Sequence, residues 1–383
     1  MEQRTLGRTG LRVSAISLGT EYLINQPREH VARVIHAALE RGINYFDLFW
    51  AQPAFRDNMG AAFKGHRQRA LLTAHLGAIE EDGQGARSRD PDLSARFFLE
   101  YLRRYETDYV DILFLHNSDG QEDYDLVMRP DGLLGMAQAY QRAGQARSIG
   151  FSGHTVCTAL QAVRSGQIDL LMFPINLASH AVEGKRELYA ACAAHNVALV
   201  AMKPYGGGRL LQQGATMNLE TWQTGGPDME LTKLPAITAV RCLAYVLAQA
   251  GVSTIVPGCK NVEELDAALA YWEASAEERD FGPLLSQFDQ YVSGECVYCN
   301  HCLPCPQHID IGHTLRLLDL AMQGPRPSAA VLDEYFAMET DATDCIACGA
   351  CEVRCPFDVG VIAKMEAAAG LLNRGGSAPR VAH

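Results

Sequence analysis

The chain has 383 residues, a formal net charge of −12, 48% hydrophobic residues and 20% charged residues. This composition is typical of a folded globular protein, and the length predicts two or three domains. The negative charge, without a local cluster of Lys and Arg, argues against nucleic acid as a partner. The N-terminal sequence does not resemble a secretory signal, and no apolar stretch is long enough to span a bilayer. We therefore expect a cytoplasmic protein without a membrane partner.

Short apolar runs alternate with segments of helical periodicity over most of the chain. The runs predict eight strands, at residues 15–18, 44–48, 70–76, 110–116, 147–152, 170–177, 198–204 and 253–257. Eight β-then-α units favour an α/β fold with a closed (β/α)8 TIM barrel over an open sheet. The preceding segment, RTLGRTGLRVS, predicts a hairpin across the barrel floor.

The connection after the seventh strand, residues 209–234, is too long and irregular for an ordinary loop. It follows a strand on the face where barrels carry their sites, so it predicts a lid or rim loop. Beyond residue 282 the sequence predicts short helices around cysteine-containing loops. We therefore expect a barrel domain at residues 1–285 and a small, mainly helical, ferredoxin-like iron-sulfur domain at residues 286–383.

Two runs of four cysteines, each closed by a proline, contain eight of the chain's twelve cysteines. They are CVYCNHCLPCP, with Cys296, Cys299, Cys302 and Cys305, and CIACGACEVRCP, with Cys345, Cys348, Cys351 and Cys355. The second run has the spacing of bacterial ferredoxins, and the first is one residue tighter at its end. Thiolates are soft anionic ligands that suit iron, so the runs predict two 4Fe-4S clusters. Zinc sites built from paired CxxC elements and a disulfide framework are the alternatives.

The fourth cysteine of each run is expected to bind the cluster of the other run, as in two-cluster ferredoxins. Cys355 then completes the cluster held by the first three cysteines of the first run. Cys305 completes the cluster held by the first three cysteines of the second run. The remaining cysteines are scattered, and three of them, Cys157, Cys192 and Cys242, fall in apolar helical patterns that predict burial.

The barrel region resembles the aldo-keto reductase family over nearly its whole length. The segments that carry the resemblance are RTLGRTGLRVSAISLGT, INYFD, YVDILFLHN, SIGFSGH and TIVPGCKNVEEL. With its cysteine-rich tail, the chain resembles the branch of this family that has a C-terminal ferredoxin-type domain. The resemblance implies a catalytic Asp, Tyr, Lys and His at the strand ends. It also implies an extended nicotinamide cofactor that is bound without a Gly-rich Rossmann loop.

The resemblance assigns the Asp to Asp47 and the His to His116, but the Tyr and the Lys are replaced. Gln52 stands at the Tyr position, and either Ala74 or His75 stands at the Lys position. A Gln amide cannot release a proton near neutral pH, so the usual acid for carbonyl reduction is missing. Since imidazole titrates near neutral pH, His75 and His116 are the candidate acid and base. The alternative for His75 is a packed or hydrogen-bonded barrel residue.

The positions that hold the nicotinamide ring in the family are also altered. This chain has Ser152, Gly153, Met172 and Met202 there, and only the serine is retained. Asn176, Lys203 and the glycines beginning at Gly206 are the remaining candidates to line the mouth. Lys203 either supplies a positive charge to the site or forms a structural ion pair, for example with Asp47.

The segment PGCKNVEEL matches the part of the family that binds the adenosine phosphate. It places Gly258, Lys260 and Asn261 at the start of a predicted helix, where free N–H groups and the helix dipole attract anions. Phosphate sites after the last two strands occur in barrels of many kinds, so this segment indicates a phosphorylated ligand without singling out NADP(H).

The pairing of a nicotinamide with iron-sulfur clusters raises a problem of electron number. A nicotinamide delivers two electrons as a hydride, whereas each cluster passes one electron at a time. A flavin accepts a hydride and releases single electrons, so it would couple the two. We expect an iron-sulfur oxidoreductase whose clusters relay electrons between a ferredoxin-like partner and a small-molecule substrate or flavin at the barrel mouth. The alternatives are an NADPH-dependent reductase with structural clusters and a non-catalytic electron-transfer or partner-binding subunit.

Overall fold

The computed structural model describes residues 1–211, 236–288, 294, 296, 298, 300–322 and 326–372. Almost all of the expected lid, 209–234, lies outside the described residues, as does Cys299. The chain divides into two compact units. The barrel unit comprises Met1–Glu80, Arg87–Gly206 and Leu219–Tyr291, and the cysteine unit comprises Glu81–Ala86, Gly207–Asn218 and Val292–His383. Every helix in the described ranges is too short or too polar to cross a membrane.

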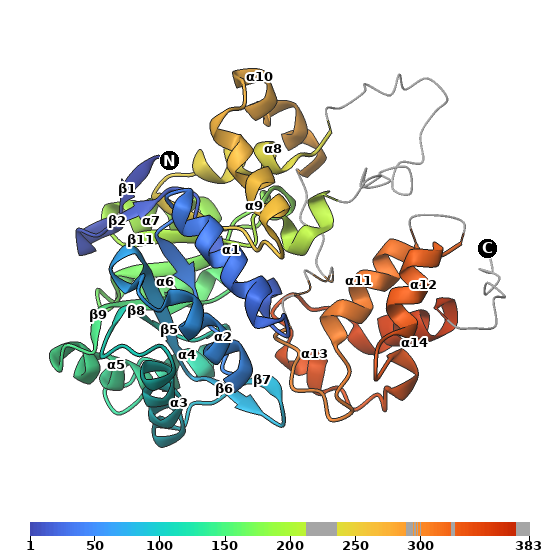
Figure 1. The fold of residues 1–383 in the computed structure, drawn as a ribbon, viewed down its shortest axis with the longest axis horizontal. Helices are drawn as coiled ribbons and strands as arrows, with labels where there is room; N and C mark the ends of the chain where they lie inside the picture. The colour runs from blue at the N-terminus through green and yellow to red at the C-terminus, as the bar shows by residue number, and fades with distance from the viewer. Residues whose placement is uncertain are drawn as a thin grey trace. The chain divides into compact units, whose positions relative to one another are not determined.

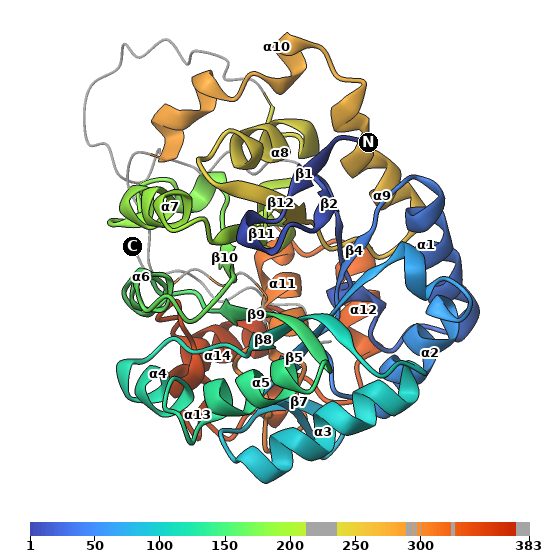
Figure 2. The same cartoon turned by 90° about the vertical axis from the view of Figure 1, so that its left-hand side faces the viewer.

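Eight parallel strands form the barrel unit (Figures 1 and 2). In sheet order they are β3 Leu18–Gly19, β4 Tyr45–Asp47, β5 Leu71–Leu76, β8 Val110–Leu115, β9 Ala146–Ser152, β10 Leu170–Pro174, β11 Ala198–Met202 and β12 Val252–Val256. Parallel bridges from Ile16 to Ile255 and from Gly19 to Gly258 connect the two ends of the sheet. The eight predicted strands are confirmed, and they form the nearly closed barrel that was expected.

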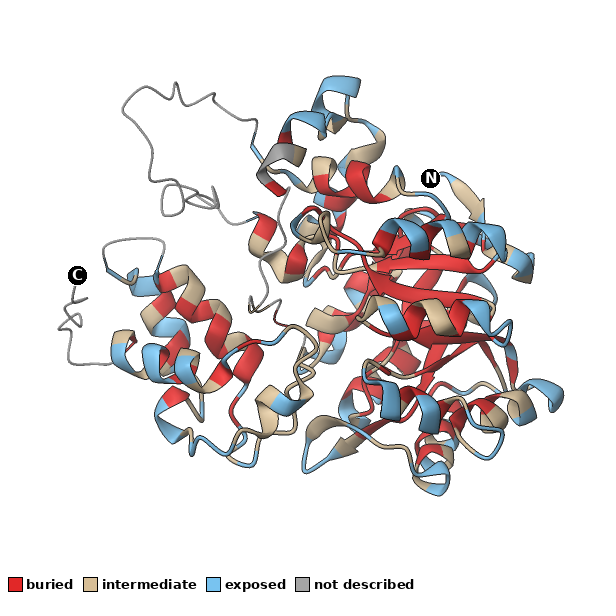
Figure 3. Cartoon of the chain, turned by 180° about the vertical axis from the view of Figure 1, so that it is seen from behind, coloured by how far each residue is buried: buried red, intermediate tan, exposed pale blue. Residues whose placement is uncertain are grey.

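Helices surround the strands, and their exposed faces form the outside of the unit (Figure 3). They are α1 Arg28–Glu40, α2 Pro53–Phe63, α3 Pro91–Arg104, α4 Gln121–Val127, α5 Leu133–Arg142, α6 Val156–Arg164, α7 Lys185–Ala194, α8 Ala239–Leu247, α9 Val262–Leu269 and α10 Ala276–Arg279. α3 shows why they form here. Asp90 caps its first turn by accepting the Leu93 N–H, Pro91 takes the first helical position, and Phe97 and Tyr101 lie on the buried face.

Alternate residues of the strands point into the barrel and form its apolar interior. This core contains Leu6, Val13, Tyr45, Ile112, Phe114, Leu170, Met172, Ala198, Val200 and Val256. Leu6 and Val13 come from the N-terminal hairpin of β1 Gln3–Thr5 and β2 Arg12–Ser14, whose Arg8 N–H donates to the Asn196 carbonyl just before β11. The hairpin therefore covers the floor, as predicted. Since the apolar side chains fill the lower layers, polar side chains are left for the carboxyl ends of the strands.

Two features of the described structure differ from the sequence-based expectation. A second hairpin, β6 Ala78–Glu81 and β7 Gln84–Arg87, follows β5 directly and was not predicted. Gly77 makes the turn into it with a φ of +91°, which a residue with a side chain rarely adopts. Cys157 is exposed, so the prediction that it is buried is wrong, whereas Cys192 and Cys242 are buried. Cys157 lies near the start of α6, on the side that faces solvent.

The cysteine unit is mainly helical, as expected. Its helices are α11 Ile311–Ala321, α12 Ala329–Phe336, α13 Ala350–Arg354 and α14 Val361–Leu371. Asp310 and Ser328 cap α11 and α12 by accepting backbone N–H groups of the first turn. A core formed chiefly by Leu315, Leu318 and Met365 packs α11 against α14, and the described cysteines of both runs lie at its edge.

Lys185 is buried below the carboxyl end of β10 and anchors the loop that carries Asn176. Its ammonium group donates to the Pro174 carbonyl at 2.9 Å and to Ser179 Oγ at 2.6 Å. Burial lowers the pKa of Lys185 to about 7. An unfolded lysine titrates near pH 10.4, to a rough approximation. Unfolding therefore takes up a proton between these two pH values, so this contribution to stability is full at high pH and is lost as the pH falls toward 7.

We expect the variant Lys185→Met to have a flatter dependence of unfolding free energy on pH than the wild type between pH 7 and 10. The difference in slope should approach about 1.4 kcal/mol per pH unit, the value for one proton. Urea unfolding followed by circular dichroism at several pH values measures it. Lys64→Met is the matched control, because Lys64 is an exposed lysine paired with Glu106. Equal slopes for wild type and Lys185→Met would contradict the prediction.

Candidate functional site

Asp47, His75 and His116 form a hydrogen-bonded chain at the carboxyl ends of β4, β5 and β8. His75 Nε2 lies 3.0 Å from Asp47 Oδ1, and His75 Nδ1 lies 3.1 Å from His116 Nδ1. Thr73, two residues before His75 on β5, places its hydroxyl 3.4 Å from the same Asp47 oxygen. Asp47 and His75 are only 6% and 8% exposed. Because Thr73 and His75 share the inward face of β5, His75 rather than Ala74 reaches the aspartate.

The contacts between these three side chains restrict which ring nitrogens carry protons. If His75 donates its Nε2 proton to Asp47, its Nδ1 is an acceptor, and His116 must donate from its own Nδ1. Nε2 of His116 is then the proton-accepting atom at the end of the chain. Burial, with a further contribution from His75, lowers the pKa of His116 well below its usual value. The arrangement can therefore accept, hold and return one proton.

Arg89 and Phe49 hold His116 in place. Arg89 donates to the carbonyls of His116 and Asn117, at 2.8 and 2.7 Å, while its other bonds go to the Asp123 carboxylate. The ring of Phe49 lies nearly parallel to that of His116, with 6.4 Å between centroids. Sequence reasoning missed both residues. Phe49 was visible as an aromatic two residues after Asp47, but nothing in the sequence connected Arg89 with His116.

A second polar chain at the carboxyl ends of the strands consists of Asp119, His154 and Lys203. Lys203 Nζ lies 3.3 Å from His154 Nε2, and His154 Nδ1 lies 3.0 Å from Asp119 Oδ2. Asp119 also accepts the backbone N–H groups of His154 and Thr155. The described contacts of Lys203 do not include Asp47, so the suggested ion pair between them is not present. Asp119 and His154 were not recognised from the sequence.

Three other predicted residues lie near the same strand ends. Ser152 Oγ accepts the Asn117 N–H at 2.9 Å, and Asn176 donates to the Lys203 carbonyl at 2.9 Å while its oxygen accepts the Ser179 N–H. Their polar groups therefore already support the loops that carry His116 and Lys203. Gln52 precedes α2, and its side-chain oxygen is buried without a partner among the described residues. An amide oxygen in this position is a ready acceptor for a ligand.

The expected phosphate site lies at the start of α9. Asn261 Oδ1 caps the helix by accepting the Glu264 N–H, and Lys260 pairs with the Glu264 carboxylate at 3.1 Å. Gly258 lies against the ring of Tyr22, where a side chain would leave its Cβ 2.7 Å from a ring carbon. An anion bound here would have to compete with Glu264. Gly206, the remaining predicted residue, donates its N–H to the Lys203 carbonyl.

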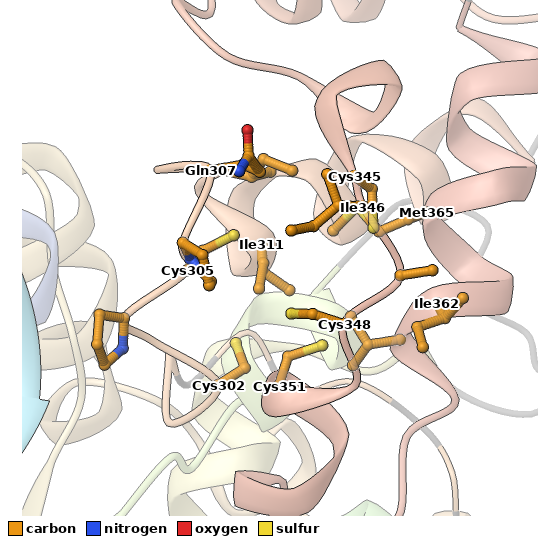
Figure 4. Close-up of a pocket in the computed structure, with 15 residues that line it drawn as sticks. Cys302, Cys305, Gln307, Ile311, Cys345, Ile346, Cys348, Cys351, Ile362 and Met365 are labelled. Carbon is orange, nitrogen blue, oxygen red and sulfur yellow. The ribbon is translucent and has the colours of Figure 1, made fainter.

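The cysteine unit has two pockets that gather thiols from both cysteine runs. One is lined by Cys302, Cys305, Cys345, Cys348 and Cys351, and the other by Cys296, Cys302 and Cys355. Figure 4 shows the first pocket, where Ile311, Ile346 and Met365 complete a largely apolar wall around the cysteines. Each pocket thus contains the fourth cysteine of one run together with earlier cysteines of the other.

The residues around these pockets fit iron-sulfur clusters. Arg354 Nη1 donates to the carbonyls of Cys302 and Pro304, both at 2.7 Å, and so ties α13 to the first cysteine loop. The Tyr298 N–H points to Cys296 Sγ at 3.3 Å, a donor of the kind that tunes cluster potentials. Among the described residues, which leave out Cys299, no three metal-binding side chains converge on a single ion. Thiols spread around a space suit a cubane, because each of its ligands binds a different iron.

Comparison with known proteins identifies both parts of the chain. The aldo/keto reductase family matches residues 15–284, and a 4Fe-4S dicluster domain matches residues 295–360. The uncharacterized oxidoreductase YqkF of Bacillus subtilis (strain 168) is 22% identical over 289 residues, which is 69% of this chain and 89% of the relative. L-galactose dehydrogenase of Arabidopsis thaliana is 24% identical over 292 residues, 70% of this chain and 88% of that protein.

Solved structures share the barrel. The holo form of an aldo-keto reductase from Bacillus halodurans aligns with a TM-score of 0.60 and 22% identity. The alignment covers 76% of this chain and 97% of that one. At this level of identity the likeness concerns the fold.

We expect His116 to be uncharged at pH 6.5, with its proton on Nδ1, because burial opposes the charged ring. ¹⁵N NMR of histidine-labelled protein, using two-bond couplings to the ring protons, reports the tautomer and the protonation state. In His75→Phe the contribution of the His75 ring to the lowered pKa of His116 is lost, so that pKa should rise. His195→Gln, which changes an exposed histidine, is the control. A protonated His116 at pH 6.5 in the wild type would contradict the prediction.

Proposed function

This oxidoreductase belongs to the aldo/keto reductase family, and we propose that it exchanges electrons between its iron-sulfur domain and a small molecule or flavin at the barrel mouth. The proposal assigns residues 1–285 to the barrel domain and 286–383 to the iron-sulfur domain. The observation that carries the proposal is the series of hydrogen bonds from Asp47 through His75 to His116. It provides proton transfer where the family's Tyr and Lys are replaced.

The proton chemistry follows from the hydrogen bonds. His116, neutral at working pH, takes a proton on Nε2, and the positive charge is shared with His75 through the Nδ1 contact. Asp47 stabilises that charge through its contact with His75 Nε2. Return of the proton from His116 to the substrate restores the starting state. Gln52, which cannot act as an acid near neutral pH, offers a buried acceptor oxygen instead.

The eight cysteines of the two runs are the proposed cluster ligands, in the crossed arrangement that the two pockets support. When bound, 4Fe-4S clusters supply single-electron transfer. Cys348 is exposed and lies beside Ile346, which is 59% exposed. An exposed apolar surface next to a cluster ligand suits a weak, transient contact, and it supports a ferredoxin-like partner as the electron source.

Gln84 and Arg87 both lie on β7, and each has hydrogen bonds within its own unit. Within the cysteine unit, Gln84 accepts the Cys305 N–H and donates to the Cys305 carbonyl, both at 3.0 Å. Three residues further on, in the barrel unit, Arg87 donates to the Asn117 carbonyl at 2.8 Å. Asn117 follows His116 directly.

The cofactor at the barrel mouth is the open part of the proposal. The Glu264 carboxylate at the start of α9 and the occupied hydroxyl of Ser152 weaken the case for NADP(H) bound as in the family. A flavin would connect a two-electron reaction to single-electron donors. The ring of Phe49, half-buried beside His116, offers an aromatic surface on which a planar ligand could stack.

Single replacements test the crossed ligation. We expect Cys355→Ser to perturb the cluster of the first run and Cys305→Ser that of the second, because each removes the thiolate donated by the other run. Iron and sulfide analysis with EPR of the reduced protein measures the change. Cys157→Ser, at an exposed cysteine outside both runs, is the control and should retain about eight irons. Loss of the same cluster in both variants would argue against the crossing.

Electron flow tests the proposed function. Anaerobic protein reduced by dithionite should be reoxidised by a small molecule or flavin that binds the barrel, with the rate lowered in His116→Phe but unchanged in Cys157→Ser. Cluster absorbance follows the reaction. Clusters that remain reduced with every ligand tried, while NADPH binds and supports turnover, would favour the reductase with structural clusters. Stable capture of a partner protein without any turnover would favour the non-catalytic subunit.

A further inference from the structure

Lys203 is a half-buried cation whose charge is not matched by a carboxylate in the described part of the chain. The two contacts of its Nζ are His154 Nε2 at 3.3 Å and the Met202 sulfur at 3.7 Å. No described Asp or Glu forms an ion pair with it, whereas Asp47 and Asp119 each contact a histidine. A neutral imidazole and a thioether leave the ammonium without a counter-ion among the residues that the structure describes.

The fold holds Lys203 in an unfavourable backbone conformation. Its φ of 55° lies in the left-handed region, which residues with a side chain seldom adopt. The Asn176 side chain and the Gly206 N–H both donate to the Lys203 carbonyl, at 2.9 and 3.0 Å, and so maintain this conformation. Strained residues of this kind concentrate at binding and catalytic sites. The turn places the side chain against His154.

Asp119 and His154 orient the ammonium group. The His154 side chain is 2% exposed and donates a hydrogen bond from Nδ1 to Asp119, so its Nε2 accepts a hydrogen bond from Lys203. Burial lowers the pKa of His154, which keeps the ring neutral and able to accept. At Gly153 an added Cβ would lie 3.3 Å from Asp119 Oδ1. The carboxylate thus occupies the space that a larger residue at position 153 would need.

From this geometry we propose that Lys203 binds a carboxylate group of the substrate and that Asp119 and His154 are its positioning residues. A single ammonium, without an arginine or a group of N–H donors beside it, suits one negative charge better than a phosphate dianion. The substrate would then be a small organic acid, held by Lys203 at β11 while its reacting atom lies within reach of His116. As a statement about the substrate this rests on the proposed function. Anion binding by Lys203 does not require turnover.

The experiment uses acetate as the probe and acetamide as its neutral counterpart. Full-length holoprotein carrying [methyl-¹³C]methionine reports binding through Met202, whose sulfur lies next to Lys203 Nζ, with buried Met172 as the internal reference. At constant ionic strength, acetate should shift the Met202 signal saturably and acetamide should not. In Lys203→Gln the affinity should fall about tenfold or more, and Lys203→Arg should retain part of it.

The positioning role has its own variants. His154→Leu removes the acceptor and should weaken acetate binding severalfold, whereas His154→Gln keeps an acceptor oxygen and should restore part of the affinity. Thermal unfolding establishes that each variant is folded. An unchanged Met202 signal up to about 100 mM acetate, or equal binding in Lys203→Gln, would overturn the proposal. Because no reductant is present, failure of electron transfer would leave this result unaffected.

Discussion

The hydrogen bond between His75 Nε2 and Asp47 determines the proton chemistry available at the barrel mouth. It fixes the tautomer of His75, and through the contact of the two Nδ1 atoms it also fixes that of His116. A lysine beside Asp47 would offer only N–H donors, whereas the imidazole of His75 has a second nitrogen that contacts His116. This one exchange of residue type converts an electrostatic support into a route for a proton.

The two hydrogen-bonded groups of side chains at the strand ends have the same arrangement but end on different residue types. In each, a carboxylate accepts from one nitrogen of a buried histidine, and the other nitrogen faces a further side chain. The first chain ends on neutral His116 and can take up a proton. The second ends on Lys203, which keeps its positive charge. Under the two proposals, the group that moves a proton is separate from the group that attracts an anion.

The barrel and the cysteine runs could be predicted from the sequence because each depends on local patterns. Short apolar segments indicated the strands, and the spacing of the cysteines indicated the cluster-binding loops. Side chains alternate along β5, so Thr73 and His75 lie on the same face. This alternation could have indicated from the sequence that His75 rather than Ala74 contacts Asp47. The partnership of Asp119 with His154 could not be predicted, because it joins loops after different strands. The β6–β7 hairpin was missed because its short polar strands show no alternation.

A site that receives electrons one at a time needs a different general acid from a site that receives a hydride. In hydride transfer the electrons arrive together, and one positioned acid such as a tyrosine completes the reaction. When electrons arrive one at a time, the negative charge that each adds to the substrate needs a proton at that moment. Once protonated, an imidazole with a lowered pKa returns its proton far more readily than a phenol with a pKa of about 10. The pair formed by His75 and His116 suits such stepwise chemistry, and Gln52 removes the competing acid. Under the proposed function, the replacement of the family's residues and the presence of the iron-sulfur domain would meet the same requirement.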